Sequence, residues 1–502
     1  MTDMMLIAEN QDLYRYEIHS LVKAFYPQED VRVVVDGSEK ARKLEDEAAE
    51  TFMHVFMEEN GITLIIRRGG EETVSKTAAG DDENFARKSP ACKTALKHLL
   101  YNTLTEFTGQ KLPWGDLIGI RPTKIPMTMM EDGSTPEEAR RFLENEHYVS
   151  AEKAALAVDI AQRESRVLSK LHYKNGYSLY IGIPFCPTTC LYCSFPSFNV
   201  ALWKEHVDDY LAALEKEMEA CADLFAGKIL DTVYIGGGTP TTLSPAQLER
   251  LIAAIRRNFD TSRLLEFTVE AGRPDSITKD KLQVLKENGI SRISVNPQTM
   301  KDETLRIIGR HHSVQQVIDT YFMARDLGFD NINMDIILGL PAENGEDVRH
   351  TVTEIEKLSP DSLTVHSLAV KRASRLRRII DENGYPTLVN TDETMRIAAQ
   401  GAARMGMEPY YLYRQKNMSG NFENTGYAKP SKYGIYNILI MEEKQSILAL
   451  GAGSISKIVV PGQGGSRIER SDNPKDVASY IAHTDEMIRR KRELYRGLLG
   501  GV

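Results

Sequence analysis

The chain has 502 residues, of which 42% are apolar and 26% charged, as is typical of a globular protein with two or three domains. Its formal net charge of −9 argues against a broad nucleic-acid-binding surface. No apolar run is long enough to span a membrane, and the first residues lack both a basic start and a long apolar run. We therefore expect a cytoplasmic protein with no membrane span and no nucleic-acid partner.

Residues 1–172 form the first predicted part, an α+β extension. A β-branched run covers Val31–Val35, and residues 51–68 are typical of a hairpin because two apolar runs flank Asn60-Gly61. The polar stretch 69–83 predicts a loop. Helical periodicity follows in three segments, residues 84–108, 136–146 and 150–172.

The second predicted part, residues 173–385, alternates strands with helices. This alternation predicts a parallel sheet with right-handed crossover connections. Because a closed barrel needs eight strand–helix units and only six are present, the predicted fold class is α/β with a partial, TIM-like (β/α)6 barrel. The predicted strands are residues 178–185, 232–236, 265–270, 292–296, 331–338 and 362–370.

Residues 386–502 form the third predicted part, a C-terminal α+β domain. Segments 391–405 and 474–496 have helical periodicity, and two short apolar runs, 435–441 and 446–450, lie between them. The stretch 414–432 is polar and predicts a loop. We expect the segment Tyr410–Ser431 to cover the mouth of the barrel and shield the site from water.

Three of the five cysteines lie in the motif Cys186-Pro-Thr-Thr-Cys190-Leu-Tyr-Cys193, directly after the first barrel strand. This spacing is not a disulfide framework and indicates a metal or cluster site in a reducing compartment. Three thiolates can hold three irons of a [4Fe–4S] cluster and leave the fourth iron open to a small molecule. A structural zinc site is the alternative, but such a site needs four ligands, and Cys92 and Cys221 stand alone in apolar helical stretches as expected core thiols.

Glycines and polar residues follow the next strands in turn. The turn Gly236-Gly237-Gly238-Thr239-Pro240 follows the second strand, where glycine lets the backbone approach a ligand closely. The others are Glu270 and Arg273 after the third strand, Gln298 after the fourth, Arg310 in the next helical stretch, and Asp335 and Gly339-Leu-Pro341 after the fifth. Because the carboxyl ends of parallel barrel strands share one rim, these residues predict a single ligand site.

Together, Tyr180-Ile-Gly-Ile-Pro-Phe-Cys186, the cysteine motif, Gly-Gly-Gly-Thr-Pro and Gly-Leu-Pro resemble the oxygen-independent coproporphyrinogen III oxidases, a family of radical S-adenosylmethionine (SAM) enzymes. The long N-terminal extension and Ile118-Gly-Ile-Arg-Pro-Thr123 make the chain most similar to the HemZ-type coproporphyrinogen dehydrogenases. The resemblance covers about residues 110–460. It implies a [4Fe–4S] cluster and SAM as cofactors.

The resemblance also implies a role for particular residues. The catalytic and cluster residues would be Tyr180, which approaches the SAM sulfonium, and the iron ligands Cys186, Cys190 and Cys193. The methionyl group of SAM would be held by Gly237, Gly238 and Thr239 at its amino end and by Arg310 at its carboxylate. Other polar groups of SAM would contact Glu270, Gln298 and Asp335, and its adenine would be bordered by Tyr192, Phe195 and Ala369.

The implied activity is the oxygen-independent oxidative decarboxylation of two coproporphyrinogen III propionates to vinyl groups, which gives protoporphyrinogen IX in anaerobic heme biosynthesis. The expected partners are this tetrapyrrole and an electron donor such as flavodoxin or ferredoxin. A substrate with several carboxylates needs a basic lining. The candidates for that lining are Arg121, Lys124, Lys371, Arg372 and Arg414.

Departures from the family pattern leave two alternatives open. Gly182 stands where many relatives have a histidine, and Phe195 stands where well-studied oxidases have a fourth cysteine, as it does in the HemZ and heme-chaperone branches. The chaperone branch carries a heme-ligating histidine motif in its C-terminal domain, where this chain has Tyr433-Gly-Ile-Tyr-Asn-Ile438. The alternatives are a heme-binding carrier on the same scaffold and another radical SAM reaction on a tetrapyrrole.

Overall fold

The computed structural model describes residues 4–27, 29–45, 51–78, 84–119, 121–172, 175–371, 373–383, 388–414, 422–462 and 465–499. The chain divides into two compact units. The first comprises Met1–Asp159, Arg378–Pro386 and Tyr413–Glu423, and the second comprises Ile160–Arg377, Thr387–Leu412 and Asn424–Val502. The predicted division into three parts stays a prediction. Within the described ranges, no helix has both the length and the apolar character needed to cross a membrane.

The first unit contains a mixed sheet with the strand order β2-β1-β3-β4-β5. Its strands are β1 (Met4–Glu9), β2 (Asp30–Val35), β3 (Thr51–Glu58), β4 (Gly61–Arg68) and β5 (Glu71–Ala78). The predicted hairpin is confirmed as β3 and β4, which pair antiparallel up to Glu58 and Gly61. The predicted loop over 69–83 is wrong at 71–78, where β5 pairs with β4. The strand β5 lies at the sheet edge and its side chains are mostly exposed. It therefore lacks the apolar run from which a strand is predicted in the sequence.

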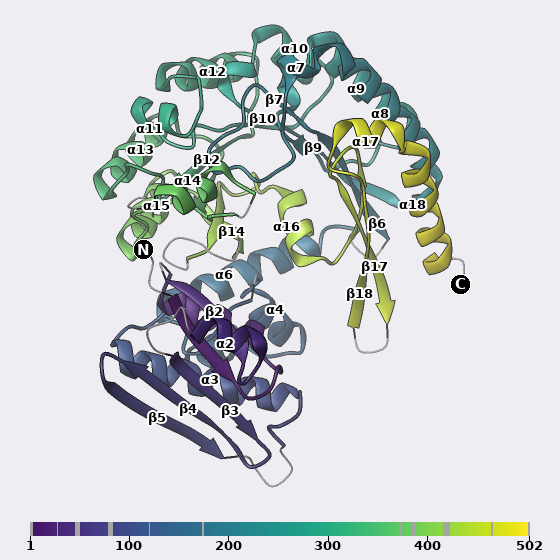
Figure 1. The fold of residues 1–502 in the computed structure, drawn as a ribbon. Coiled ribbons are helices and arrows are strands. Elements are labelled where there is room, and N and C mark those ends of the chain that lie inside the picture. Colours follow the sequence, from purple (N-terminus) through teal and green to yellow (C-terminus); the bar gives the residue numbers. More distant parts are fainter. Residues whose placement is uncertain are drawn as a thin grey trace. The chain divides into compact units, whose positions relative to one another are not determined.

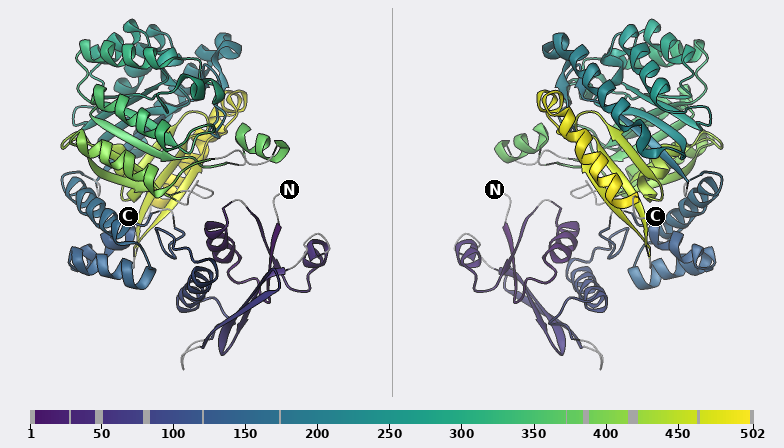
Figure 2. Two further views of the ribbon diagram at one scale, coloured as in Figure 1. Left: turned by 90° about the vertical axis from the view of Figure 1, so that its left-hand side faces the viewer. Right: turned by 90° about the vertical axis from the view of Figure 1, so that its right-hand side faces the viewer.

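Helices cover both faces of this sheet (Figure 2). Helix α1 (Arg15–Phe25) and helix α3 (Pro90–Thr108) pack together over one face and form the main apolar core with β1, β3 and β4. The short helix α2 (Glu39–Glu45) covers the other face at β1 and β2 through a separate small cluster. Three more helices follow in the chain: α4 (Lys124–Glu131), α5 (Pro136–His147) and α6 (Ala151–Leu168).

The second unit is built on a curved sheet in which the predicted parallel strands are neighbours in chain order. They are β6 (Gly176–Ile183), β9 (Ile229–Gly237), β10 (Glu266–Gly272), β11 (Arg292–Val295), β12 (Ile332–Leu338) and β13 (Ser362–Ser367). Figure 1 shows the crossover helices on the outer side of this sheet. These helices are α8 (Val207–Cys221), α9 (Pro245–Asn258), α10 (Lys279–Glu287), α12 (Val314–Asp326) and α13 (Gly345–Leu358). The predicted partial (β/α)6 barrel is confirmed.

Short elements complete the loops of the barrel and lead into the C-terminal segment. On the cysteine side, β7 (Phe185–Cys186) pairs with β8 (Phe198–Asn199), which is followed by α7 (Val200–Trp203). The remaining helices are α11 (Asp302–Ile307), α14 (Arg375–Asn383), α15 (Asp392–Arg404), α16 (Ile435–Glu442), α17 (Val477–Ala482) and α18 (Thr484–Leu499). The predicted last helix, 474–496, is therefore two helices that meet near His483.

Strands from the C-terminal segment extend the barrel sheet at both edges. Next to β13 lie β15 (Asn424–Ala428), which is antiparallel, and then β14 (Glu408–Tyr413). Next to β6 lie β16 (Ser446–Leu450), which is parallel to it, and then β17 (Ile455–Gly462) and β18 (Gly465–Asp472). These additional strands occupy the positions that would otherwise be exposed sheet edges.

The strand β15 corrects the expectation for the polar stretch 414–432. Its residues are buried, and Asn424 Oδ1 accepts a hydrogen bond from the backbone N–H of Ser367 at 2.8 Å. Polar side chains are compatible with burial when the sheet and a neighbouring backbone satisfy them. The predicted loop and cover over the barrel mouth are therefore wrong for residues 424–428, and residues 415–421 lie outside the described residues.

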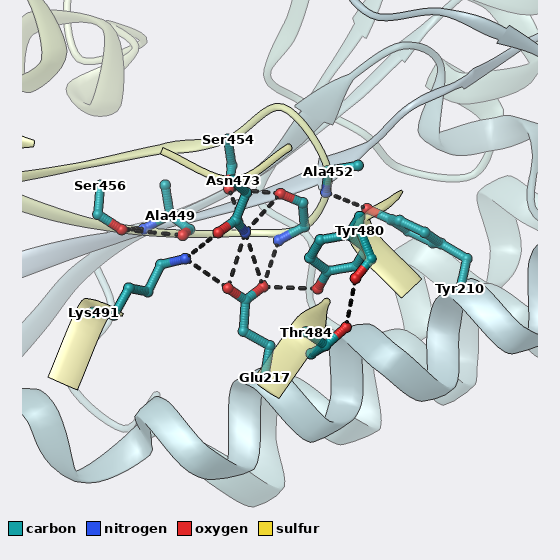
Figure 3. A network of polar contacts seen from close by, with 11 residues as sticks. Tyr210, Glu217, Ala449, Ala452, Ser454, Ser456, Asn473, Tyr480, Thr484 and Lys491 are labelled. Atoms are coloured by element: carbon teal, nitrogen blue, oxygen red, sulfur yellow. Dashed lines mark hydrogen bonds and ion pairs between the residues drawn. The ribbon is translucent and has the colours of Figure 1, made fainter. Parts of the chain in front are cut away.

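A buried polar network joins the C-terminal helices to the barrel (Figure 3). The Glu217 carboxylate on α8 accepts hydrogen bonds from Lys491 Nζ at 2.6 Å, Tyr480 Oη at 2.7 Å and Asn473 Nδ2 at 2.9 Å. It also accepts the backbone N–H of Gly451 at 2.8 Å. Both charged side chains, Glu217 and Lys491, are fully buried. Removing any one of these donors would leave a buried carboxylate oxygen with fewer hydrogen bonds, which is costly away from water.

Replacing Lys491 with Met should lower the free energy of unfolding by about 3–5 kcal/mol, because Glu217 would remain as a buried charge without its cation. Urea-induced unfolding of the cofactor-free protein measures the loss. The control is Arg490→Met on the same helix, because the Arg490 side chain is exposed and pairs with Glu486 one turn away. We expect less than about 0.5 kcal/mol from the control. Equal effects of the two substitutions would contradict the role assigned to Lys491.

Candidate active site

The carboxyl ends of the parallel strands bring the cysteine motif, the glycine turn and the polar residues to one end of the barrel sheet. The cysteine loop follows β6, the glycine turn ends β9, Glu270 lies near the end of β10, and Asp335 lies within β12. The backbone of Gln298, just after β11, bonds to that of β12: its N–H donates to the Asp335 carbonyl at 2.9 Å. The sequence prediction of one shared rim therefore agrees with the strand order.

The cysteine loop is held in place by a buried arginine. Arg273 donates through Nη1 to the Thr188 carbonyl at 2.9 Å and to the Thr188 hydroxyl at 2.8 Å. Its other nitrogens, Nε and Nη2, pair with the Asp275 carboxylate at 3.0 and 2.6 Å. On the far side of the loop, the Leu191 N–H donates to the Ile308 carbonyl at 2.9 Å. Arg273 therefore positions the loop between its first two cysteines, and its charge is balanced by Asp275.

The three thiols of the loop are unpaired and partly shielded from water. Cys186, Cys190 and Cys193 form no disulfide, and the Cys193 N–H donates to the Cys190 carbonyl at 3.2 Å. Burial raises the pKa of Cys186 to about 11 and also raises the pKa of Cys193. Such thiols become thiolates when a cation coordinates them, as iron does. Cys92 and Cys221 are buried as predicted, on α3 and α8.

The glycine turn lies directly against the strand that leads into the cysteine loop. The Gly238 N–H donates to the Ile183 carbonyl and the Thr239 N–H to the Phe185 carbonyl, both at 2.7 Å. Gly237 has a φ of +109°, and a Cβ on Gly238 would lie 2.6 Å from the Phe185 carbonyl oxygen. Only glycine fits this close approach. The Thr239 hydroxyl is 3.4 Å from the Cys186 sulfur, so the turn and the first cysteine form one structure.

Three tyrosines and a glutamate line the interior next to the glycine turn. The rings of Tyr180, Tyr234 and Tyr436 all contact one another, with centroid separations of 6.2 Å for Tyr180–Tyr234, 4.5 Å for Tyr234–Tyr436 and 6.3 Å for Tyr180–Tyr436. The Tyr234 hydroxyl donates a short hydrogen bond to Glu270. Burial raises the pKa of Glu270 to about 7; the Tyr234 hydrogen bond opposes this shift and the nearby Asp335 carboxylate adds to it. Glu270 can therefore be protonated or ionised near neutral pH.

The polar groups around Asp335 form a second part of the site. Its carboxylate accepts hydrogen bonds from Asn296 Nδ2 at 2.8 Å and Asn333 Nδ2 at 2.7 Å, and His366 Nε2 lies 3.8 Å away. Burial acts to raise the pKa of Asp335, but His366 and Asn333 outweigh it and the pKa lies below the usual value. Gln298 adopts the left-handed backbone region with a φ of +67°, which is uncommon for a non-glycine residue and often marks a functional site.

Arg310 is buried between the cysteine loop and β11. Its Nη1 donates to the Asn296 carbonyl at 2.7 Å, and its charge lies next to Tyr192 and Cys190. Among the described residues, the buried polar atoms here that have no hydrogen-bond partner include Arg310 Nε and Asn296 Oδ1. A buried donor and acceptor without partners are costly unless a ligand meets them. This part of the site therefore fits a ligand with both an anionic group and hydrogen-bond donors.

Two predicted adenine neighbours have different surroundings from Tyr192. Phe195 is 71% exposed, so most of its surface faces solvent. Ala369 follows β13 at the same end of the sheet as the other residues. The roles proposed for these residues stay predictions.

The five basic residues predicted to line the substrate site do not all belong to the same unit of the structure. Lys371 follows β13 and, among the described residues, has no acidic partner; burial lowers its pKa. Arg414 is buried in the first unit, where it donates to the Leu117 carbonyl and lies over the Trp114 ring. Its guanidinium therefore has a structural partner. Arg121 and Lys124 also belong to the first unit, and Arg372 lies outside the described residues.

Sequence reasoning missed several residues of the site. Strand alternation could have found Tyr234, which lies two residues before Gly236, and Asn333, which lies two before Asp335. His366 is the last residue but one of the sixth parallel strand and could have been found as a polar residue near a strand end. Tyr436 had no such signal, because α16 comes from a distant part of the chain.

Comparisons with known proteins agree with this geometry. The radical SAM superfamily model matches residues 180–355. The oxygen-independent coproporphyrinogen-III oxidase-like protein HemZ of Bacillus subtilis is 40% identical over 411 residues, which are 80% of this chain and 82% of HemZ. The chain belongs to the oxygen-independent coproporphyrinogen III oxidase-like family. As radical SAM proteins, members of this family carry a [4Fe–4S] cluster and SAM, and the three thiols and the unpaired polar atoms fit these groups.

Two other relatives of this radical SAM chain carry different names. The heme chaperone HemW of Bacillus subtilis is 40% identical over 195 residues, which are 39% of this chain and 51% of HemW. The solved structure of the coproporphyrinogen III oxidase HemN of Escherichia coli matches with a TM-score of 0.50 and 25% identity, over 65% of this chain and 73% of that chain. The family is thus shared by a named oxidase and a named chaperone.

Proposed function

We propose that this protein catalyses the oxygen-independent oxidative decarboxylation of coproporphyrinogen III propionates to vinyl groups. For each propionate, a hydrogen atom leaves the β-carbon, one electron passes to a one-electron acceptor, and carbon dioxide departs to leave the carbon–carbon double bond. The similarity to HemZ over four-fifths of the chain supports an enzyme of this type. The observation that carries the substrate choice is Lys371, a part-buried ammonium after β13 that has no acidic partner among the described residues.

When bound, the cluster and SAM together would supply the radical chemistry that removes the hydrogen atom. The chain itself binds and orients. The Cys186, Cys190 and Cys193 thiolates would hold the cluster, and Arg273 keeps their loop in place. Arg310 would pair with the methionyl carboxylate through its free Nε.

Other residues shape the place where the substrate would react. The stacked tyrosines Tyr180, Tyr234 and Tyr436 give the interior a wall of aromatic rings that excludes water. Glu270 holds the Tyr234 hydroxyl and, with a pKa near 7, can keep or release a proton during turnover. Lys371 would attract a propionate carboxylate, because an ammonium without a counter-ion in a partly buried place favours an anion.

The second candidate function is heme carriage, which the similarity to HemW favours. Against it stands the C-terminal sequence, where no histidine occurs between His366 and His483. At the position of the chaperone motif, α16 instead supplies Tyr436, which stacks on Tyr234. A neutral histidine is a common proximal ligand for heme iron, so its absence predicts weak heme binding.

The test is an anaerobic incubation of the reconstituted protein with SAM, a reductant and coproporphyrinogen III, followed by mass spectrometry. We expect vinyl products, carbon dioxide and 5′-deoxyadenosine to form in step. Lys371→Met should raise KM for the porphyrinogen by about tenfold, because one charge contact with the substrate is lost. The control is Lys204→Met, which removes an exposed lysine of the same unit and should leave KM unchanged. Stoichiometric heme binding without vinyl product would support the carrier, and a methylated or opened ring would support another tetrapyrrole reaction.

A further inference from the structure

The first unit contains a cluster of two histidines and an aspartate that the proposed activity does not use. His98 lies on α3, Asp116 in the loop after it, and His147 at the end of α5. One donor atom from each side chain, an imidazole nitrogen or a carboxylate oxygen, lies within 4.8 Å of the other two. We propose that these three residues bind a divalent transition metal ion of the zinc class.

The backbone brings two of these side chains together from distant positions in the sequence. The Asp116 N–H donates to the His147 carbonyl at 3.0 Å, and His147 Nδ1 lies 2.8 Å from Asp116 Oδ1. Gly115, just before Asp116, has a φ of +53°, and a Cβ there would lie only 1.8 Å from the His147 carbonyl oxygen. Glycine is therefore required for the loop to reach the end of α5.

The third side chain has a donor atom without a partner. His98 Nε2 is buried and, among the described residues, forms no hydrogen bond, although it lies 3.6 Å from Asp116 Oδ2. A buried imidazole nitrogen without a partner is unusual in a folded protein. A metal ion bound between His98 and Asp116 would satisfy it. His98 and His147 are partly exposed, which leaves a path for the ion to enter.

The set of donor atoms decides which metal fits. Two imidazole nitrogens and one carboxylate oxygen suit Zn²⁺, Co²⁺ or Fe²⁺, whereas Ca²⁺ and Mg²⁺ prefer oxygen ligands throughout. Burial acts to raise the pKa of Asp116, but His147 and Lys97 outweigh it, so the carboxylate is ionised and ready to coordinate. A water molecule would complete the four-coordinate shell.

Lys97 competes for the same carboxylate. Its Nζ lies 3.1 Å from Asp116 Oδ2 and balances the charge of that buried group when no metal is bound. A metal ion would take over this balance and release the lysine. The Lys97→Met variant should therefore bind the metal more tightly than the natural sequence, by at least about tenfold, which is the effect expected from losing one adjacent positive charge.

Cobalt(II) titration of the untagged full-length chain tests the site, in a background with Cys186, Cys190 and Cys193 changed to Ala so that thiolates do not bind the ion. One equivalent of Co²⁺ should bind, with visible d–d absorption and no thiolate charge-transfer band. His98→Gln should weaken binding at least about tenfold, because it removes one ligand from the half-exposed face of α3. His206→Gln, which removes an exposed histidine paired with Asp209, should leave binding unchanged.

Zinc provides an independent readout. Added Zn²⁺ should raise the thermal unfolding midpoint of the background chain and raise that of the His98→Gln variant less, because the ion stabilises only the folded site. Circular dichroism of the two proteins should be the same, which shows that the variant folds. Equal Co²⁺ affinity in both chains, the absence of Co²⁺ binding, or weaker binding in Lys97→Met would overturn the proposal.

Discussion

Replacing Cys190 with Ala should abolish the iron–sulfur absorbance of the reconstituted protein. The three thiols lie on one loop after β6, and Cys190 is the buried middle one, with Arg273 Nη1 3.9 Å from its sulfur. Three thiolates are needed to hold three irons of the cluster, so the loss of one removes most of the bound iron. Anaerobic reconstitution followed by iron analysis and absorbance spectroscopy measures the effect. We expect the same loss for Cys186→Ala and Cys193→Ala.

The two remaining cysteines give matched controls for this experiment. Cys92 is buried in the core of the first unit, and Cys221 is buried on α8 of the second. Each behaves as a small apolar residue. Cys92→Ala and Cys221→Ala should therefore retain the full iron content and lose only a little stability. A full complement of iron in Cys190→Ala would show that the motif was misassigned.

Replacing Arg310 with Met should leave the cluster in place and weaken SAM binding by about thirtyfold or more, since truncating one partner of a buried charge pair costs about 2–5 kcal/mol. The buried Nε of Arg310 has no hydrogen-bond partner among the described residues and would donate to the methionyl carboxylate. The substitution removes this donor and its positive charge. Calorimetric titration of the reconstituted protein with SAM measures the change in affinity. Arg310→Lys should recover part of the affinity, because an ammonium keeps the charge but not the forked geometry.

Arg306 is the control for this substitution. It lies in the last turn of α11, only four residues before Arg310, and its side chain is exposed. Arg306→Met should therefore leave both cluster content and SAM affinity unchanged. If Arg310→Met bound SAM as tightly as the natural sequence, the carboxylate role would belong to another residue.

The sequence by itself determined the barrel and the cluster loop. Strands with buried runs such as Ile332–Leu338 alternate with amphipathic helices, and this local periodicity is enough to specify a parallel sheet with crossover helices. The cysteine spacing is equally local, because all three cysteines of the motif lie within eight residues. The order of motifs along the strands then predicted a common rim, because chain order and strand order are the same here.

Only the tertiary structure decided which distant residues complete the site. Tyr436 reaches the interior from α16, and Asn296 meets Asp335 from the segment that directly follows the neighbouring strand β11. Neither contact follows from local periodicity, because it depends on how elements far apart in the chain pack together. The same reason explains Arg414, which looked like a substrate ligand in the sequence and is instead buried against Trp114.

The elements that the sequence missed share one physical property. The strand β5 is polar because it lies at a sheet edge, and β15 is polar because sheet pairing and Ser367 satisfy its buried groups. Both segments form strands because they pair with a neighbouring strand, and their own residue pattern does not indicate this. The sequence therefore determined the barrel and the chemistry of its rim, whereas the tertiary structure determined the sheet edges, the aromatic interior and the meeting of His98, Asp116 and His147, because each of these needs contacts between segments distant in the chain.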